Sequence, residues 1–163
     1  MKLSKAMAEA LNGQVNEEIN SAYIYASMST DFADKNLDGF AAWMNKQAAE
    51  ELKHAEKIKS YLYERNSRVR LGALKAPQTE WKSPSDAMKD ALKHEQYISD
   101  CILKLTETAG KEKDTATEVF LQWFVSEQVE EEASVQNVLN KLAMTGDSSV
   151  GLYNLDRELG MRT

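Results

Sequence analysis

Glutamate and histidine side chains occupy positions where the helical pattern of this sequence predicts apolar residues. Glu51 and His54 form a Glu-x-x-His pair, and residues three apart lie on one face of a helix. Four more glutamates interrupt an apolar series in the same way, and they are Glu18, Glu95, Glu127 and Glu131. Carboxylate oxygens with one imidazole nitrogen suit iron or manganese, because structural zinc favours cysteine and histidine and calcium uses oxygen alone. The pattern therefore indicates a metal site.

Helices must position these side chains, because turn-forming signals are concentrated in one segment. The only two prolines are Pro77 and Pro84. Elsewhere apolar residues recur every three or four positions, which is the spacing of an amphipathic helix. This spacing predicts helices over residues 4–34, 37–65, 84–110 and 114–144, and a short fifth helix over residues 148–159. Ser83 and Asp114 are the expected N-caps of the third and fourth helices.

The lengths of the connections predict the topology. A few residues separate the first helix from the second and the third from the fourth, so each pair should be an antiparallel hairpin. The connection over residues 66–82 can span about 56 Å, which exceeds the roughly 45 Å length of a 30-residue helix. The second and third helices can then run parallel. We expect one all-α domain over residues 1–163, a four-helix bundle with one long crossover.

The interrupting glutamates share a depth in this bundle. Each lies near the middle of its helix, and helix midpoints are the only level that all helices of an antiparallel bundle share. The side chains should therefore converge on one layer. Burying several uncompensated carboxylates there would cost many kcal/mol, whereas two divalent cations would neutralise most of the charge.

Each residue also has a structural interpretation. A single glutamate on a helix is usually solvated, which we expect for Glu132, and His54 by itself could be a hydrogen-bonded core histidine. His94 should lie beside the site or at the surface, and Tyr25 is either a core aromatic or a hydrogen-bond partner of the site. Core positions are expected for Trp43 and Trp123.

Composition disfavours several classes of protein. The chain has 163 residues and a formal charge of −6, and nucleic-acid binding depends instead on an excess of Lys and Arg. Cys101 is the only cysteine, so a disulfide framework is excluded. No apolar run approaches the roughly 20 residues of a membrane span, and the first residues lack the apolar segment of a secretory signal. We expect a cytoplasmic protein that binds small cations, with no nucleic acid and no membrane as partner.

Several stretches of the sequence resemble the haem-free prokaryotic ferritins. The matching residues extend over nearly the whole chain, at 10–12, 39–44, 50–54, 94–95, 120–133 and 155–159. The stretch over residues 120–133, which reads FLQWFVSEQVEEEA, is long enough to be specific. The resemblance implies a ferritin-like four-helix bundle with one long crossover and a short fifth C-terminal helix.

The resemblance also implies a di-iron ferroxidase centre. One iron would bind Glu18, Glu51 and His54. Glu51 would bridge to a second iron, which Glu95 and Glu131 would hold.

Further positions match residues that surround the two irons in the family. Gln128 matches a glutamine near the second iron, and Tyr25 matches a tyrosine near the first. Additional carboxylates would form a third iron site beside the pair, and they are Glu50, Glu127 and Glu130.

The function that the resemblance implies is iron storage. Fe(II) would bind the pair, be oxidised by O2 or H2O2, and move as Fe(III) mineral into the cavity of a cage of about 24 subunits. Haem is not expected, because Leu52 stands where a bacterioferritin has its haem-ligating methionine, and Glu130 replaces the histidine of a second Glu-x-x-His. Two alternatives stay open from the residues: a di-iron oxidase or peroxidase that mainly detoxifies oxidant, and a metal-free helical scaffold.

Overall fold

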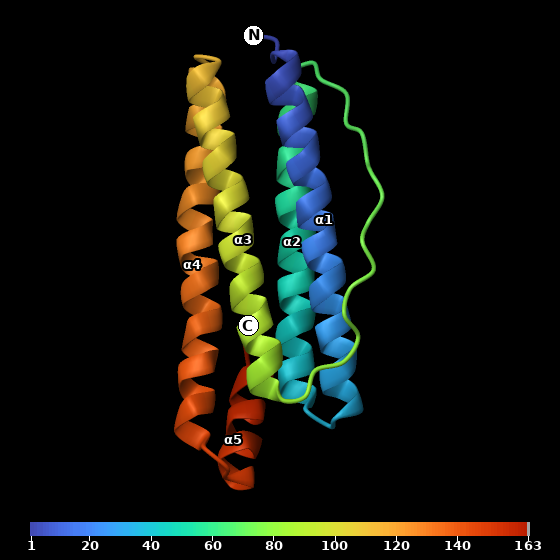
Figure 1. Ribbon diagram of the computed structural model, residues 1–163, viewed down its shortest axis with the longest axis vertical. Coiled ribbons are helices and arrows are strands. Elements are labelled where there is room, and N and C mark those ends of the chain that lie inside the picture. The colour runs from blue at the N-terminus through green and yellow to red at the C-terminus, as the bar shows by residue number, and fades with distance from the viewer. Residues whose placement is uncertain (163) are drawn as a thin grey trace.

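The computed structural model describes residues 1–162, which contain five helices and form an elongated bundle (Figure 1). The helices are α1 (Lys5–Asp34), α2 (Asp38–Glu64), α3 (Pro84–Lys111), α4 (Thr115–Thr145) and α5 (Ser149–Gly160). Each begins and ends within one residue of the position expected from the sequence. The predicted all-α fold is confirmed.

The helix starts follow from local hydrogen bonds. Ser83 accepts a bond from the Asp86 backbone N–H and precedes a first-turn proline, and Asp114 accepts from the Thr117 N–H. The N-cap of α2 is Leu37, whose apolar side chain cannot accept a hydrogen bond from the first turn of the helix. Instead, the Phe40 N–H donates to Asp156 Oδ1 of α5 at 2.9 Å. Helix α5 thus caps α2 from outside that helix.

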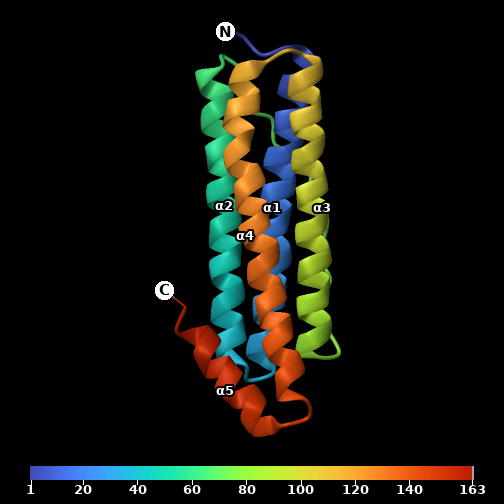
Figure 2. The same ribbon diagram turned by 90° about the vertical axis from the view of Figure 1, so that its left-hand side faces the viewer.

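Helices α1 and α2 form one hairpin, and α3 and α4 form the other (Figure 2). The crossover between α2 and α3 runs along the outside of α1 for nearly the length of the bundle (Figure 1). Two asparagines of α1 hold it there. Asn12 bonds the backbone of Arg68 and Arg70, and Asn16 bonds the backbone of Gly72 and Ala73. Because this segment spans the bundle, α2 and α3 run parallel as predicted.

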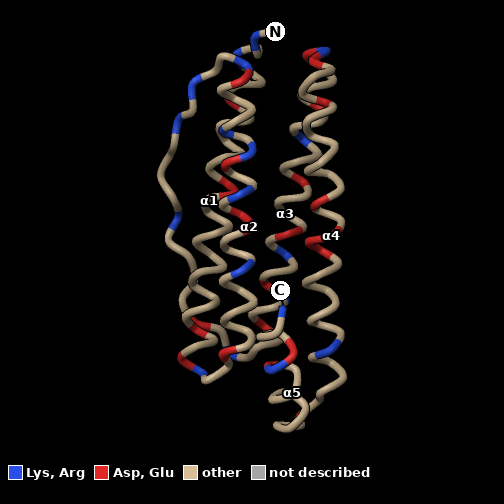
Figure 3. Tube along the Cα trace, turned by 180° about the vertical axis from the view of Figure 1, so that it is seen from behind, with Lys and Arg blue, Asp and Glu red and all other residues tan. Residues whose placement is uncertain are grey.

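Two apolar clusters fill the bundle, and a polar layer separates them. On α1 one cluster ends at Val15 and the other begins at Tyr25. On α3 the corresponding boundary residues are Ala91 and Ile98. Acidic positions occur at mid-height on all four long helices (Figure 3). The interruptions in the sequence pattern therefore mark one level of the fold.

Trp123 of α4 lies outside the core. It is 39% exposed, so the core position predicted for it is wrong, whereas Trp43 is buried as expected. The Trp123 ring packs edge-on against His54, with 5.5 Å between ring centroids, and the Lys57 ammonium lies 4.3 Å from the Trp123 centroid. Trp123 therefore covers the polar layer from the outside. Cys101 is half-buried.

None of the helices within residues 1–162 is both long and apolar enough to cross a membrane.

Candidate metal centre

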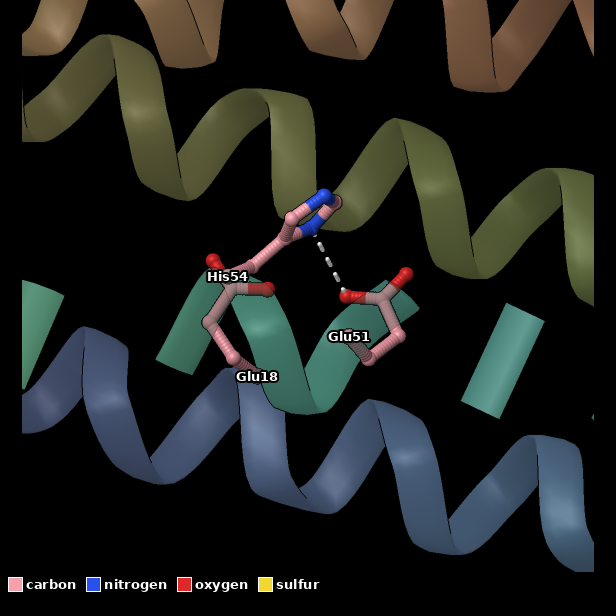
Figure 4. A group of neighbouring side chains, drawn as sticks. All are labelled: Glu18, Glu51 and His54. Carbon is pink, nitrogen blue, oxygen red and sulfur yellow. Dashed lines mark ion pairs between the residues drawn. The ribbon is translucent and has the colours of Figure 1, made fainter. Parts of the chain in front are cut away.

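Glu18, Glu51 and His54 form a buried cluster between α1 and α2. One potential ligand atom from each lies within 4.8 Å of the others, and all three residues are buried. His54 Nδ1 is 3.3 Å from Glu51 Oε2, one helical turn away. Figure 4 shows Glu18 reaching from α1 toward the two side chains of α2. The helical spacing of Glu51 and His54 thus places both on the face of α2 that points into the bundle.

A second group shares His54 and adds two carboxylates of α4. Ligand atoms of His54, Glu127 and Glu131 also lie within 4.8 Å of one another. His54 Nε2 is 3.7 Å from Glu127 Oε1. Glu131 is buried and Glu127 is half-buried. The His54 imidazole therefore lies between the two groups, with Nδ1 toward Glu51 of α2 and Nε2 toward Glu127 of α4.

Glu95 of α3 is fully buried and reaches the same layer from the opposite hairpin. Its carboxylate accepts hydrogen bonds from the Tyr25 hydroxyl and, at 3.2 Å, from Gln128 Nε2. Within residues 1–162, Glu95 belongs to neither of the two ligand groups. Tyr25 therefore contacts the glutamate expected on the second iron, although the resemblance places this tyrosine near the first.

Two buried glutamines support the carboxylates, and the sequence reasoning missed both. Gln14 Nε2 donates to Glu18 Oε1 at 2.9 Å, and Gln47 Nε2 donates to Glu131 Oε2 at 2.8 Å. Gln14 lies one turn before Glu18, and Gln47 lies one turn before Glu51. The available signal was the same as for the glutamates, a polar residue on the apolar face of a helix.

Some acceptor atoms in the cluster have no hydrogen bond. Among the described residues, Glu18 Oε2 and Glu51 Oε2 are buried without a hydrogen bond, and the contact of Glu51 Oε2 with His54 Nδ1 at 3.3 Å is an ion pair only when the imidazole is protonated. An unsatisfied buried acceptor is destabilising, and it costs more when it is charged. A cation between these oxygens would supply the missing interaction. The donor set therefore fits a metal ion better than it fits a purely structural role.

The electrostatics of the layer point the same way. Burial, reinforced by neighbouring carboxylates, raises the pKa of Glu18 and of Glu51 well above the usual range for glutamate. Burial also raises the pKa of Glu95 and raises that of Glu131 to about 7. Without a cation, protons must bind here to limit repulsion. A bound cation would displace those protons because it stabilises the ionised carboxylates.

The expected third-site residues lie at the edge of the layer. Glu50 is half-buried and pairs with Arg162, with 2.9 Å between Glu50 Oε2 and Arg162 Nη2, and Glu130 is exposed. In the part of the chain described, neither belongs to a ligand group. Of the three expected residues, only Glu127 does. Glu132 is half-buried and accepts from Ser99 Oγ at 2.5 Å, so the solvated position expected for it is wrong.

His94 packs against Tyr25 on the side away from the ligand groups. Its Nε2 is 2.7 Å from Ser21 Oγ, and its ring meets Tyr25 edge-on with 5.9 Å between centroids. Burial lowers the pKa of His94 to about 4, so the imidazole is neutral at physiological pH. It supports Tyr25 and does not reach the ligand groups.

Comparison with known proteins identifies the family. Residues 8–145 match the Ferritin family, described as a ferritin-like domain, and the chain belongs to this family. A bacterial non-haem ferritin of Staphylococcus aureus (strain MRSA252) is 40% identical over 161 residues, covering 99% of this chain and 97% of that protein. A bacterial non-haem ferritin of Bacteroides fragilis (strain 638R) is 36% identical over 160 residues, with coverage of 98% and 99%.

Solved structures agree with this assignment. The open pore ferritin of the hyperthermophilic archaeon Archaeoglobus fulgidus superimposes with a TM-score of 0.98 at 46% identity, covering 99% of this chain and 100% of that one. The predicted ferritin-like four-helix bundle with a short fifth helix is therefore confirmed.

Proposed function

We propose that this protein stores iron by oxidising Fe(II) in the buried carboxylate layer and keeping the Fe(III) product as mineral inside a hollow homo-oligomer. The observation that carries the proposal is the convergence of Glu18, Glu51 and His54, because buried carboxylate oxygens of the two glutamates without hydrogen bonds favour a multivalent cation. Membership of the ferritin family supports iron as that cation and storage as the outcome. The cytoplasmic location expected from the sequence is part of the same proposal.

Iron is the substrate of this chemistry, and the residues supply a binding frame for two ions. Glu18, Glu51 and His54 would bind the first, and Glu51 would be shared with the second. Glu95 and Glu131 would bind the second, with Gln128 and Tyr25 orienting Glu95. Hard anionic oxygen ligands favour Fe(III) over Fe(II), which promotes loss of an electron from each ion. Two ions together reduce O2 to H2O2, or H2O2 to water, with uptake of two protons in either case.

The product must leave the layer for storage to follow. Glu127 is half-buried and Glu130 is exposed, so the carboxylates of α4 lead from the buried layer toward solvent. We place the third iron site along this path, at Glu50, Glu127 and Glu130. An edge site of this kind binds loosely because solvent competes for the ion and screens the charges.

Assembly into a cage of about 24 subunits is the second part of the proposal. The similarity to the Archaeoglobus ferritin extends over 99% of this chain, including the crossover and α5. These segments lie outside the four-helix core and are available for contacts between copies. Light scattering should give a mass of a large closed oligomer, and a monomer or dimer under all salt and metal conditions would contradict a cage.

A direct test of oxidation uses Fe(II) bound anaerobically, followed by addition of O2. The proposal predicts a fast phase that grows with added iron up to two ions per chain and then gives way to slower uptake. Glu18→Ala should abolish the fast phase. Glu56→Ala is the matched control, since Glu56 is an exposed glutamate of the same bundle. Fast oxidation that is equal in both variants would place the reaction elsewhere.

A further inference from the structure

The C-terminal tail leaves α5 from a fixed position on α2. Asp156 caps the start of α2, and Leu155 and Leu159 are buried against the bundle. A Cβ atom at Gly39 would lie 1.6 Å from the Asp156 carbonyl oxygen, so the backbones of α2 and α5 meet directly. The residues that follow α5 are therefore brought to the flank of α2 that carries Gln47 and Glu50.

Arg162 makes three contacts on this flank. Its Nη2 donates to Glu50 Oε2 at 2.9 Å, and its Nη1 donates to Gln47 Oε1 at 2.5 Å. The guanidinium carbon lies 4.8 Å from the centroid of the Trp43 ring. Fixing a long arginine side chain in one conformation costs side-chain entropy, so favourable contacts must offset that cost. Here the Glu50 carboxylate, the Gln47 amide and the Trp43 ring together provide these contacts.

These contacts connect the tail to the polar layer. Gln47 Oε1 accepts a hydrogen bond from Arg162, and Gln47 Nε2 donates a hydrogen bond to Glu131 Oε2 at 2.8 Å. Glu50 adds to the repulsion that raises the pKa values of Glu51 and Glu131. The positive charge of Arg162 thus lies where the metal-free protein has an excess of negative charge.

We propose that Arg162 is an internal counter-cation of Glu50 and that a metal ion binding at Glu50 displaces it, releasing the C-terminal tail. This inference rests on the proposed function, because it assigns a competitor to the expected third iron site. A divalent ion on the Glu50 carboxylate would lie within a few ångströms of the guanidinium, and like charges at that spacing repel. Arg162 is therefore a positioning residue whose charge sets the affinity of the third site.

The test measures metal affinity and tail mobility in the assembled, iron-free protein. Zn²⁺, which is not redox active, is titrated by calorimetry into wild type, Arg162→Gln and Arg162→Lys. Arg157→Gln is the matched control, since Arg157 is an exposed arginine of α5. A spin label at Met161→Cys in a Cys101→Ser background reports mobility, because Met161 neighbours Arg162 and is 70% exposed in the single chain.

The expected result is that Arg162→Gln binds the weakest Zn²⁺ equivalent about two- to fivefold more tightly than wild type, in keeping with loss of one partly exposed ion pair. Arg157→Gln should resemble wild type, and Arg162→Lys, which keeps the charge but not the two-nitrogen contact, should lie closer to wild type in Zn²⁺ affinity than Arg162→Gln does. The label should become mobile when that equivalent binds to wild type, and should be mobile without metal in Arg162→Gln.

Equal affinities in wild type and Arg162→Gln, or a label whose mobility is unchanged at Zn²⁺ saturation, would overturn the role of Arg162 while leaving the proposed function intact. Wild type that binds two ions per chain but no third would overturn the role of Arg162 alone. Wild type that binds fewer than two would overturn the proposed function, and the role of Arg162 with it.

Discussion

The hydroxyl of Tyr25 on α1 donates a hydrogen bond to the carboxylate of Glu95 on α3, 70 residues further along the chain. This bond joins the two hairpins of the bundle at the level of the polar layer. Burial raises the pKa of Glu95, and the bonds from Tyr25 and Gln128 oppose that effect because they stabilise the ionised carboxylate. Tyr25 therefore holds a candidate iron ligand in place before any metal arrives.

Tyr25→Phe should destabilise the metal-free protein by about 1–2 kcal/mol, because Glu95 loses a buried donor. It should also slow Fe(II) oxidation, since Glu95 is no longer oriented. Tyr61→Phe is the control, because Tyr61 is a buried tyrosine that bonds Thr117 and Arg65 away from the layer. Denaturant melting and stopped-flow oxidation measure the two effects. Oxidation that is impaired equally in both variants would mean that Tyr25 acts only through stability.

Glu51→Ala should slow the fast oxidation phase by at least 10- to 100-fold, the range seen when even a supporting partner of a metal ligand is lost. Glu130→Ala should leave the fast phase intact and change the later turnover, because Glu130 is exposed at the edge of the layer. Stopped-flow traces recorded with two Fe(II) ions per chain report the fast phase, and traces recorded with many Fe(II) ions per chain also report the later turnover. An equal loss of the fast phase in the two variants would show that the pair and the third site are not distinct.

Glu95→Gln should maintain or raise the stability of the metal-free protein at pH 8, by up to about 1 kcal/mol, because it removes one charge from the layer. The amide oxygen still accepts the Tyr25 bond, which an apolar residue would leave unsatisfied. Stabilisation by bound Zn²⁺ should shrink, since a ligand stabilises only the state that it binds. A variant that is clearly destabilised without metal, yet gains as much from Zn²⁺ as wild type, would remove Glu95 from the site.

Stability of the metal-free protein should fall as pH rises from about 4.5 to about 7. The folded state raises the pKa of Glu131 to about 7, so it keeps a proton that the unfolded chain releases over this interval. The resulting loss is on the order of a few kcal/mol. Glu131→Gln should flatten this slope in chelator-treated samples melted at pH 5, 6 and 7. An identical slope in the variant would mean that Glu131 does not hold that proton.

Much of the fold could be predicted from the sequence, because an amphipathic helix can be recognised from the spacing of apolar residues within a short segment. The apolar spacing located every helix end within one residue, and the length of the crossover predicted that α2 and α3 run parallel. The polar layer was predictable for the same reason, since Glu18, Glu51 and Glu95 each interrupt an apolar series on a single helix.

Relationships between helices were harder to predict, because they depend on side-chain direction and on distant partners. Trp123 continues an apolar series along the chain, yet it lies at the rim of the bundle beside His54. Gln47 looks like an ordinary polar residue until α4 places Glu131 against it. The contact between Glu50 and Arg162 joins residues 112 positions apart and follows only from the docking of α5 on α2.

The most direct test of the central claim is the amount of iron that the assembled protein retains after aerobic addition of Fe(II). Purified metal-free protein is given increasing Fe(II) in air, separated by size, and analysed for iron and protein in the same fraction. Iron storage predicts that iron co-migrates with a large oligomer at many times the number of ions that its carboxylate sites can bind, and that Glu51→Ala loads more slowly. Iron that saturates at two or three ions per chain, with rapid oxidation preserved, would contradict storage and favour a di-iron oxidase.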